Sequence, residues 1–301
     1  MNYQSCELCP RKCRADRTKT TGYCKSGSQA KVARAALHMW EEPCISGRNG
    51  SGTVFFSGCT LGCCFCQNYS ISQEGFGKEI TVNQLADIFL RLQDQGAHNI
   101  NLVTASQFLP SVIKALDLVK HRLSIPVVYN TGGYERTEAI DLLNGYVDIW
   151  LPDFKYYSGE LAKRYSNAPD YFETASQAVA HMIEITGSPV FDCQDPKIPM
   201  MKKGVIIRHM VLPGCRADSS AILRWIAGNL PKGRYYISLL SQYTPFYHSK
   251  DHPEINRRIT SYEYQKVVDL ALELGLDQGF MQEKSSAKEE YTPPFNLEGI
   301  Q

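Results

Sequence analysis

The alternation of short apolar segments with amphipathic segments constrains the fold of this chain more than any other feature. Several of the apolar runs are nearly continuous, as in parallel strands covered on both faces. We predict strands at residues 53–57, 99–105, 126–131, 147–154, 204–212 and 234–241. Helical spacing of apolar residues predicts helices at residues 82–95, 109–121, 136–143, 171–185, 219–229 and 261–274. This order indicates an α/β fold with a parallel barrel, complete or partial, whose chemistry lies at the C-terminal ends of the strands.

The two ends of the chain fall outside this alternation. Residues 1–52 hold a separate group of cysteines and few strand or helix signals, so we predict a cysteine-rich, metal-binding extension there. Residues 53–282 would then form the barrel. Residues 283–301 are polar and contain prolines, which predicts a loose C-terminal tail.

Charge and hydropathy argue against two classes of partner. The formal net charge is +1, so no global basic patch points to nucleic acid. The N-terminus lacks the apolar stretch of a secretory signal, and no apolar run is long enough to cross a membrane. We therefore expect a cytoplasmic protein whose cysteines are reduced. Its 11 cysteines, an odd number, then favour metal binding or catalysis over a disulfide framework.

The stretch GCTLGCCFCQN, residues 58–68, follows the first predicted strand and so belongs at the working face of the barrel. Cys59, Cys63 and Cys66 have the spacing C-x3-C-x2-C, which suits three ligands of a 4Fe–4S cluster with one iron left open. Cys64 is adjacent to Cys63, and neighbouring side chains of an extended segment point apart, so we interpret it as a packing residue. The alternative is zinc, but zinc normally takes a fourth protein ligand and no histidine lies nearby.

A second cysteine group lies near the N-terminus, with the spacing C-x2-C-x3-C-x10-C. Four thiolates fully ligate either a structural Zn²⁺ or an auxiliary 4Fe–4S cluster, and the spacing does not separate the two. The four cysteines of this group are Cys6, Cys9, Cys13 and Cys24. The alternative to metal binding is that they are free thiols. Cys44 has no evident partner, and Cys193 and Cys215 are isolated and read as packing residues.

Several motifs together resemble the radical S-adenosylmethionine (SAM) superfamily, in a branch similar to pyruvate formate-lyase activating enzymes. They are FSGCTLGCCFCQNYSIS, GAHNINLVTAS, PVVYNTGGYE, DIWLPDFKYYSGELAKRYSNAPDY, IRHMVLPG and PEINRRITSYEY, and they cover nearly the whole chain. The resemblance implies a partial (β/α)6-type barrel and a 4Fe–4S cluster. It also implies reductive cleavage of SAM to a radical that abstracts hydrogen, with reduced flavodoxin or ferredoxin as electron donor.

The resemblance also implies SAM contacts at matching positions. Activating enzymes end the second strand with a Gly-Gly-Glu turn that contacts the SAM amino group. This chain reads NLVTASQF there, and the hydroxyls of Thr104 and Ser106 take the place of that turn. Asn130 stands where relatives have an Asp. The implied contacts are Phe65, Thr104, Ser106, Asn130, Asp153, Lys155 and Arg208. A surface ion pair is the alternative for Asp153 and Lys155. We read His209 as a packing residue, and Gln242 and Tyr243 stand where an activating enzyme carries a His near its substrate.

Three functions follow. The first is hydrogen abstraction from a glycine of a glycyl radical enzyme, as in activating enzymes. The second is radical SAM modification of a peptide or a small metabolite, which the altered second and sixth strand ends favour. The third, from another class, is a non-catalytic zinc-binding interaction module, which the N-terminal cysteines motivate.

Overall fold

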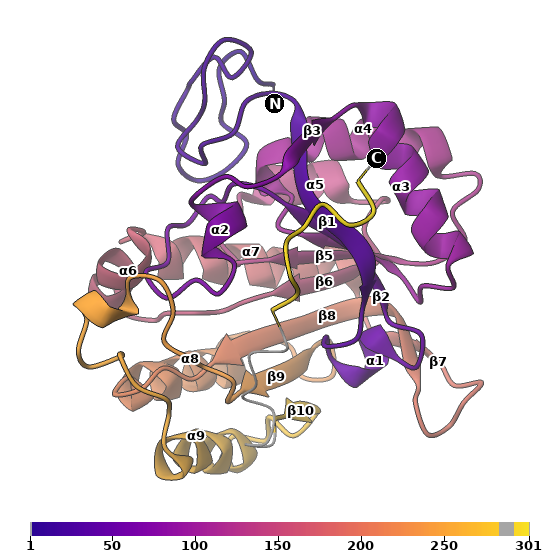
Figure 1. Cartoon of the computed structure of the whole chain (residues 1–301). Helices are drawn as coiled ribbons and strands as arrows, with labels where there is room; N and C mark the ends of the chain where they lie inside the picture. Colours follow the sequence, from indigo (N-terminus) through magenta and orange to yellow (C-terminus); the bar gives the residue numbers. More distant parts are fainter. Residues whose placement is uncertain (1, 283–291, 301) are drawn as a thin grey trace.

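The computed structural model describes residues 2–282 and 292–300 and confirms the predicted α/β class (Figure 1). The strands are β1 Ala30–His38, β2 Ser51–Phe56, β3 Lys78–Ile80, β4 Ile100–Val103, β5 Val127–Thr131, β6 Ile149–Pro152, β7 Val190–Asp192, β8 Met200–Met210, β9 Tyr236–Leu240 and β10 Gly279–Met281. The helices are α1 Pro43–Ser46, α2 Tyr69–Ser72, α3 Val82–Asp94, α4 Leu109–Val119, α5 Thr137–Leu143, α6 Gly159–Ser166, α7 Tyr171–Thr186, α8 Arg216–Asn229 and α9 Ser261–Glu273, with 3-10 turns at η1 Ser106–Phe108 and η2 Ser249–Asp251.

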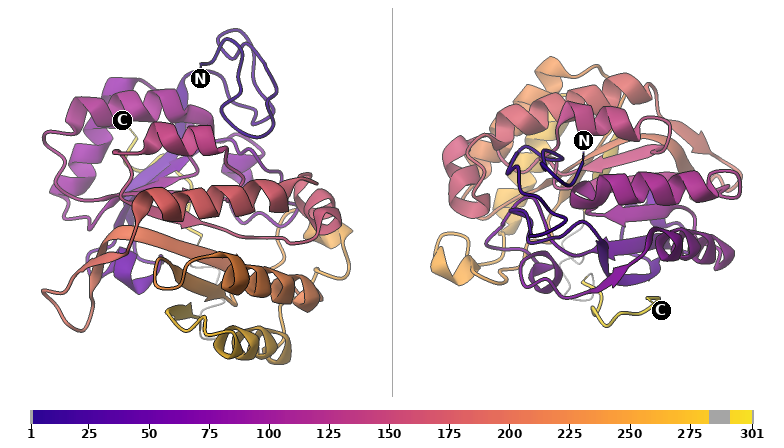
Figure 2. Two further views of the ribbon diagram at one scale, coloured as in Figure 1. Left: turned by 180° about the vertical axis from the view of Figure 1, so that it is seen from behind. Right: turned by 90° about the horizontal axis from the view of Figure 1, so that it is seen from above.

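One sheet organises the molecule, in the strand order β10-β9-β8-β6-β5-β4-β2-β1-β3. From β2 to β10 every pair along this path is parallel, whereas β1 pairs antiparallel with both β2 and β3. Helices coloured from purple to orange cover its outer face when the molecule is seen from behind (Figure 2). The parallel part is the predicted partial barrel, and all six predicted strands and six predicted helices are present within it.

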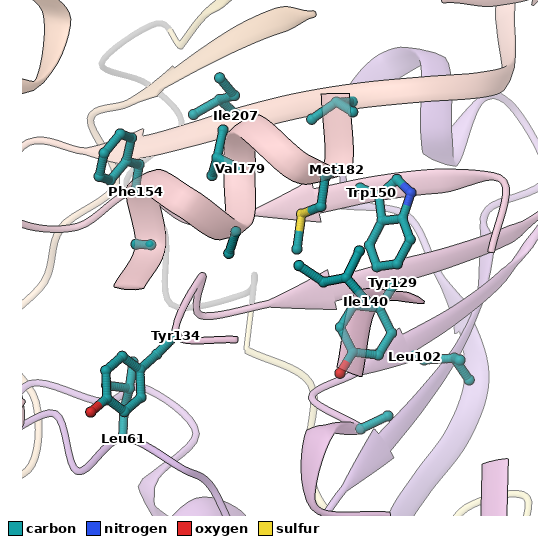
Figure 3. Packing of buried hydrophobic residues seen from close by; sticks show 14 of the residues in the cluster. Leu61, Leu102, Tyr129, Tyr134, Ile140, Trp150, Phe154, Val179, Met182 and Ile207 are labelled. Carbon is teal, nitrogen blue, oxygen red and sulfur yellow. The ribbon is translucent and has the colours of Figure 1, made fainter. Parts of the chain in front are cut away.

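The main core lies between the sheet and the outer helices. Val179 and Met182 of α7 reach the sheet beside Ile207 and Trp150, all of them within one buried cluster (Figure 3). Each large side chain that is fully buried in this way contributes about 2 kcal/mol of hydrophobic stabilisation. Thr81 begins α3 with a reciprocal capping box to Gln84, which fixes where that helix starts.

A smaller core closes the inside of the barrel at its N-terminal end. Cys44 and Ile45 of α1 are buried against residues of β5, β6 and β8, which include Val128, Ile149 and Ile206. Gly47, directly after α1, lies against His98 and Met200 at the starts of β4 and β8. The short helix α1 therefore closes the barrel at the end opposite to the strand C-termini, and Cys44 is a packing residue of this closure.

The predicted boundaries at the two ends of the chain differ from the structure. Residues 30–38 were expected within a separate extension, but they form β1 of the main sheet. This strand reads AKVARAALH, which is alanine-rich and lacks strict alternation, so strand propensity gave no signal. The part of the C-terminal segment that is described, residues 292–300, is not loose. It lies along β1, where Leu297 donates to Ala33 and Ala35 donates to Glu298 (Figure 1). Residues 283–291 of the predicted tail lie outside the described residues.

Candidate active site

The loop that carries the central cysteines leaves β2 through a tight backbone turn. Gly58 has φ +81°, and a Cβ there would lie 2.2 Å from Ser26 Oγ and 2.5 Å from the Cys24 carbonyl oxygen. Only glycine fits such a position. The Gly58 N–H donates to the Ile71 carbonyl at 2.9 Å, which closes the loop around the cysteines. The first cysteine therefore follows directly at the C-terminal end of β2, as predicted.

A cavity of about 700 Å³ opens at this end of the barrel and continues into its interior. Cys59, Cys63 and Cys66 all line it, whereas Cys64 is not among the lining residues. Six of the seven residues expected to contact SAM line the same cavity: Phe65, Thr104, Asn130, Asp153, Lys155 and Arg208. These side chains come from the ends of five different strands or their following loops, so the fold brings together positions far apart in the sequence.

Each of the three cavity thiols has a polar neighbour. Cys59 Sγ accepts from the Leu61 N–H at 3.4 Å, and Cys63 Sγ accepts from the Ser166 hydroxyl at 2.9 Å. Cys66 Sγ lies 3.3 Å from the Ser72 hydroxyl. Burial, with the neighbouring thiols, raises the pKa of Cys59, and it raises that of Cys66 to about 11. Thiols held this close destabilise one another's charge, and a bound cation relieves that cost.

Cys64 belongs to a different environment from its three neighbours. Its N–H donates to the Tyr165 carbonyl at 2.8 Å, and its carbonyl accepts from the His248 N–H at 2.8 Å. Its side chain packs against the main core, as do those of Cys59 and Cys63, but unlike theirs it does not line the cavity. Both backbone groups of Cys64 thus tie the loop to the surrounding structure, which is consistent with the packing role predicted for it.

A network of charged side chains lines the cavity beside the thiols. Asp153 bonds Lys155 Nζ at 2.5 Å and Arg208 Nε at 2.9 Å. Although burial opposes ionisation, the charges of Arg208 and Lys155 hold the pKa of Asp153 below its usual value. The side chains of Asp153 and Lys155 are only 22% and 16% exposed, so this is a partly buried pair within the cavity and not a surface pair.

Glu41 and Glu42 also line the cavity, and sequence reasoning missed both of them. Glu41 accepts from Asn130 at 3.1 Å and from Arg208 at 3.2 Å, and also from Asn101 of β4. Both glutamates directly precede α1 and therefore line the cavity from its closed end. The sequence around these two glutamates has no periodicity or motif that predicts a place in the cavity. They reach it only because β1 joins the sheet and α1 packs at the end of the barrel.

Ser106 is the one predicted SAM contact that the structure does not bring to the cavity. It is fully buried and donates a hydrogen bond to Glu135, as does Thr131. Tyr129 donates to Ser106 at 3.1 Å. The 3-10 turn η1 begins at Ser106 and turns its hydroxyl away from the strand end, so Thr104 alone of the two hydroxyls lines the cavity.

Three further residues can be placed. His209 is buried outside the barrel, where Nδ1 meets the Phe154 carbonyl and Nε2 meets the Ser219 hydroxyl of α8, in keeping with the packing role expected of it. Gln242 lines the cavity, whereas Tyr243 is buried and donates to a backbone carbonyl. Phe65 packs edge-on against the Tyr243 ring, with the ring centres 5.6 Å apart.

The N-terminal cysteines lie in one loop region next to the cysteine loop of β2. Cys6, Cys9 and Cys24 are buried and Cys13 is exposed. A Cβ on Gly22 would lie 3.3 Å from Cys13 Sγ and 3.5 Å from Cys24 Sγ, so these two sulfurs flank one glycine. Partial burial opposes ionisation of Cys13, yet backbone N–H groups of Ala15 and Tyr23 and the charge of Arg17 lower its pKa.

Arg17 sits beside these cysteines and is 2% exposed. Its guanidinium donates to the carbonyls of Ser26 at 2.9 Å and Gln107 at 2.7 Å, and it lies 3.6 Å from Cys6 Sγ. In the part of the chain that the structure describes, it has no ion pair with a carboxylate. A buried cation of this kind is costly unless a negative group lies nearby.

Within residues 2–282 and 292–300, no set of three or more His, Cys, Asp or Glu side chains is already drawn together as a metal site. Ligation by either cysteine group is therefore a proposal. The described helices include none with the length and apolar character needed to cross a membrane.

Comparison with known proteins identifies the class that this barrel and its cysteine loop define. Residues 53–192 match the Radical SAM superfamily. The chain is 30% identical over 285 residues to the uncharacterized protein MJ0674 of Methanocaldococcus jannaschii, covering 91% of this chain and 76% of that protein. The chain therefore belongs to the radical SAM superfamily.

Two solved structures share the fold at low sequence identity. The FeFe-hydrogenase maturase HydG from Carboxydothermus hydrogenoformans matches 77% of this chain and 53% of its own, with a TM-score of 0.51 and 14% identity. Streptococcus suis SuiB, in a structure bound to S-adenosylmethionine, matches 79% of this chain and 48% of its own, with a TM-score of 0.50 and 10% identity. This chain thus spans about half the length of each, and the likeness shows the fold alone.

Proposed function

We propose that this protein binds a 4Fe–4S cluster through Cys59, Cys63 and Cys66 and uses SAM to abstract hydrogen from a peptide or protein substrate. One observation carries the proposal: these three thiols open on the same cavity as Asp153 and Arg208, and Cys64 does not. Three thiolates leave one iron of a cluster free, and a cavity beside it has room for a small ligand.

The donor set fits the cluster and SAM. When bound, they supply a one-electron cleavage that yields a carbon-centred radical, as the superfamily implies. This chain's residues bind and orient the ligands and exclude water. Lys155 and Arg208 offer donors for a carboxylate, and Asn130 and Thr104 offer hydrogen bonds to a zwitterion or a ribose. Phe65 offers an apolar face at the same mouth. SuiB, which shares the fold, is the precedent for SAM in such a barrel.

The experiment uses the anaerobically reconstituted full chain and measures the electron paramagnetic resonance (EPR) signal of the reduced protein with and without SAM. We expect a signal that SAM perturbs, together with formation of 5′-deoxyadenosine. Cys64→Ala is the matched control for Cys63→Ala, because the two thiols are adjacent in sequence and only one lines the cavity. If Cys64→Ala loses the cluster while Cys63→Ala keeps it, the ligand assignment is wrong.

Hydrogen abstraction from a glycine of a glycyl radical enzyme is the first substrate hypothesis, and it rests on the resemblance to activating enzymes. Modification of a peptide or small metabolite is the second, and Gln242 at the cavity wall favours it, since activating enzymes carry a His there. A glycyl EPR signal after incubation with a partner supports the first. Substrate-dependent 5′-deoxyadenosine without any such signal supports the second. Reduced flavodoxin or ferredoxin remains the proposed donor, and the cytoplasm the proposed compartment.

We propose that the N-terminal group, Cys6, Cys9, Cys13 and Cys24, holds Zn²⁺ or an auxiliary 4Fe–4S cluster. The support is the buried charge of Arg17, because four thiolates on either metal centre carry net negative charge that would offset it. Zinc without any iron, after anaerobic reconstitution, would instead support a non-catalytic zinc-binding module.

A further inference from the structure

The closed end of the cavity carries a carboxylate that the mechanism above does not use. Glu42 is 7% exposed and lines the cavity, and its Oε2 atom is buried with no hydrogen-bond partner among the residues described. Burial raises the pKa of Glu42, and the charge of Arg208 and the nearby Ser238 hydroxyl of β9 oppose that rise. A buried carboxylate oxygen without a partner costs free energy, so its presence in a cavity points to a ligand that supplies one.

The charged residues of the cavity do not balance one another. Asp153 is paired with Lys155 and Arg208, and Arg208 is also paired with Glu41. Glu42 forms no ion pair with another described side chain. Three acids and two bases line the cavity, and burial lowers the pKa of His38, also in the lining, to about 4. Among the described residues, the cavity therefore has one more acid than base, and Glu42 is the acid that forms no ion pair.

The surroundings of Glu42 separate it from the thiols. Glu42 directly precedes α1, which closes the N-terminal end of the barrel, whereas the cysteine loop follows the C-terminal end of β2. Its neighbour Ser238 lies on β9, which β8, β6, β5 and β4 separate from β2 in the sheet. Glu42 therefore enters the cavity from the side of α1, where the charge of Arg208 also acts on it, and a ligand group that meets Glu42 lies on that side.

Apolar side chains also line the cavity. They include Met39, Phe55, Leu240, Phe280 and Met281. Such walls suit a chain of methylene groups, and a buried acid beside them that forms no ion pair suits a terminal cation.

We infer that Glu42 is a specificity residue that binds the ammonium or guanidinium group at the end of an aliphatic stem of the substrate. This inference rests on the proposed function, because only that function makes the bound cation part of a substrate. A lysine-type side chain of a peptide and a free aliphatic amine share the required chemistry. In both cases the cation meets the carboxylate of Glu42 and the methylene groups lie along the apolar walls.

The test measures binding by titration calorimetry on the anaerobically reconstituted full chain with SAM present. The probes are a short capped peptide with one lysine, the same peptide with norleucine, and 1,5-diaminopentane. We expect at least one of the two amine probes to bind. If the natural ligand is a lysine side chain of a peptide, the norleucine peptide should bind at least about tenfold more weakly than the lysine peptide. Binding of the diamine alone would make a free amine the source.

The variants are Glu42→Gln, Glu42→Asp and, as a matched surface control, Glu273→Gln at the exposed end of α9. Glu42→Gln should weaken the amine that binds by at least about tenfold and leave norleucine binding unchanged, and Glu42→Asp should recover part of the loss. The melting temperature of Glu42→Gln should not fall, because the side-chain volume is kept and a carboxylate oxygen that is buried without a partner is removed. Equal binding of lysine and norleucine, insensitivity to Glu42→Gln, or no binding of either amine would overturn the inference. The SAM-perturbed EPR signal of the same samples reports separately on the proposed function.

Discussion

The two cysteine groups of this chain lie side by side but have different surroundings. The thiols after β2 face a cavity of about 700 Å³ lined by charged, polar and apolar side chains. Three of the four N-terminal thiols are buried within their own loop region, next to the buried guanidinium of Arg17. Backbone contacts connect the groups, since Gly58 at the root of one loop lies against Cys24 and Ser26 of the other. The difference matches the proposed division between an open site for chemistry at Cys59, Cys63 and Cys66 and a closed structural site at the N-terminal cysteines.

The largest expected effect separates the three cavity thiols from Cys64. Replacing Cys59, Cys63 or Cys66 with alanine removes one of three cluster ligands, so we expect iron loading and SAM cleavage to fall below detection. Cys64→Ala should keep activity within about threefold, since its side chain does not line the cavity. Iron analysis and 5′-deoxyadenosine assays check both. An inactive, folded Cys64→Ala protein would contradict the assignment.

The second prediction concerns the N-terminal cysteine group. Cys9→Ser should release the N-terminal metal and lower the melting temperature, because a four-thiolate site stabilises a lobe that has little core of its own. The EPR signal of the central cluster should persist, although its yield can fall as the neighbouring loop loosens. Metal analysis and thermal unfolding measure the effect. Loss of the central cluster alone, with the N-terminal metal retained, would reverse the roles of the two groups.

A smaller effect tests the charge argument at Arg17. Arg17→Met removes hydrogen bonds to three backbone carbonyls, of Ser26, Gly27 and Gln107, and should destabilise the protein by about 3 kcal/mol. The loss should be greater in metal-loaded protein than in chelator-treated protein, because the guanidinium also offsets thiolate charge. Denaturant unfolding of both forms provides the comparison. An equal loss in the two forms would show that Arg17 acts only through its carbonyl partners.

The smallest prediction uses Glu135, which lies buried behind the cavity. Burial raises its pKa from 4.5 to about 7, although hydroxyl donors from Ser106 and Thr131 oppose this shift. The folded state therefore holds the proton more tightly than the unfolded state. The resulting stability, at most about 3 kcal/mol, is complete below pH 4.5 and is lost as the pH rises to about 7. Denaturant titrations between pH 4.5 and about 7 measure how the free energy of unfolding changes with pH. Glu135→Gln should make this pH dependence weaker, and an unchanged pH dependence would contradict the prediction.

The sequence predicted the barrel strands because each is a continuous apolar run, and the outer helices because their apolar spacing is regular. The spacing of the cysteines after a strand predicted the three thiols, and the family resemblance implied Asp153, Lys155 and Arg208; all six residues line one cavity. Sequence reasoning missed β1, whose alanines carry little strand propensity, and hence Glu41 and Glu42, which only that strand and α1 bring into the barrel. Ser106 was misplaced because a 3-10 turn redirects its side chain, a detail that spacing does not reveal.

The central claim is that Cys59, Cys63 and Cys66 hold a redox cluster whose free iron binds SAM. The most direct measurement combines iron, sulfide and zinc analysis of anaerobically purified protein with EPR of the reduced sample before and after SAM. We predict about four irons and a SAM-perturbed signal, with zinc in the N-terminal group, or about eight irons if that group holds a second cluster. Protein that contains no iron after reconstitution, or a signal that SAM leaves unchanged, would contradict the account.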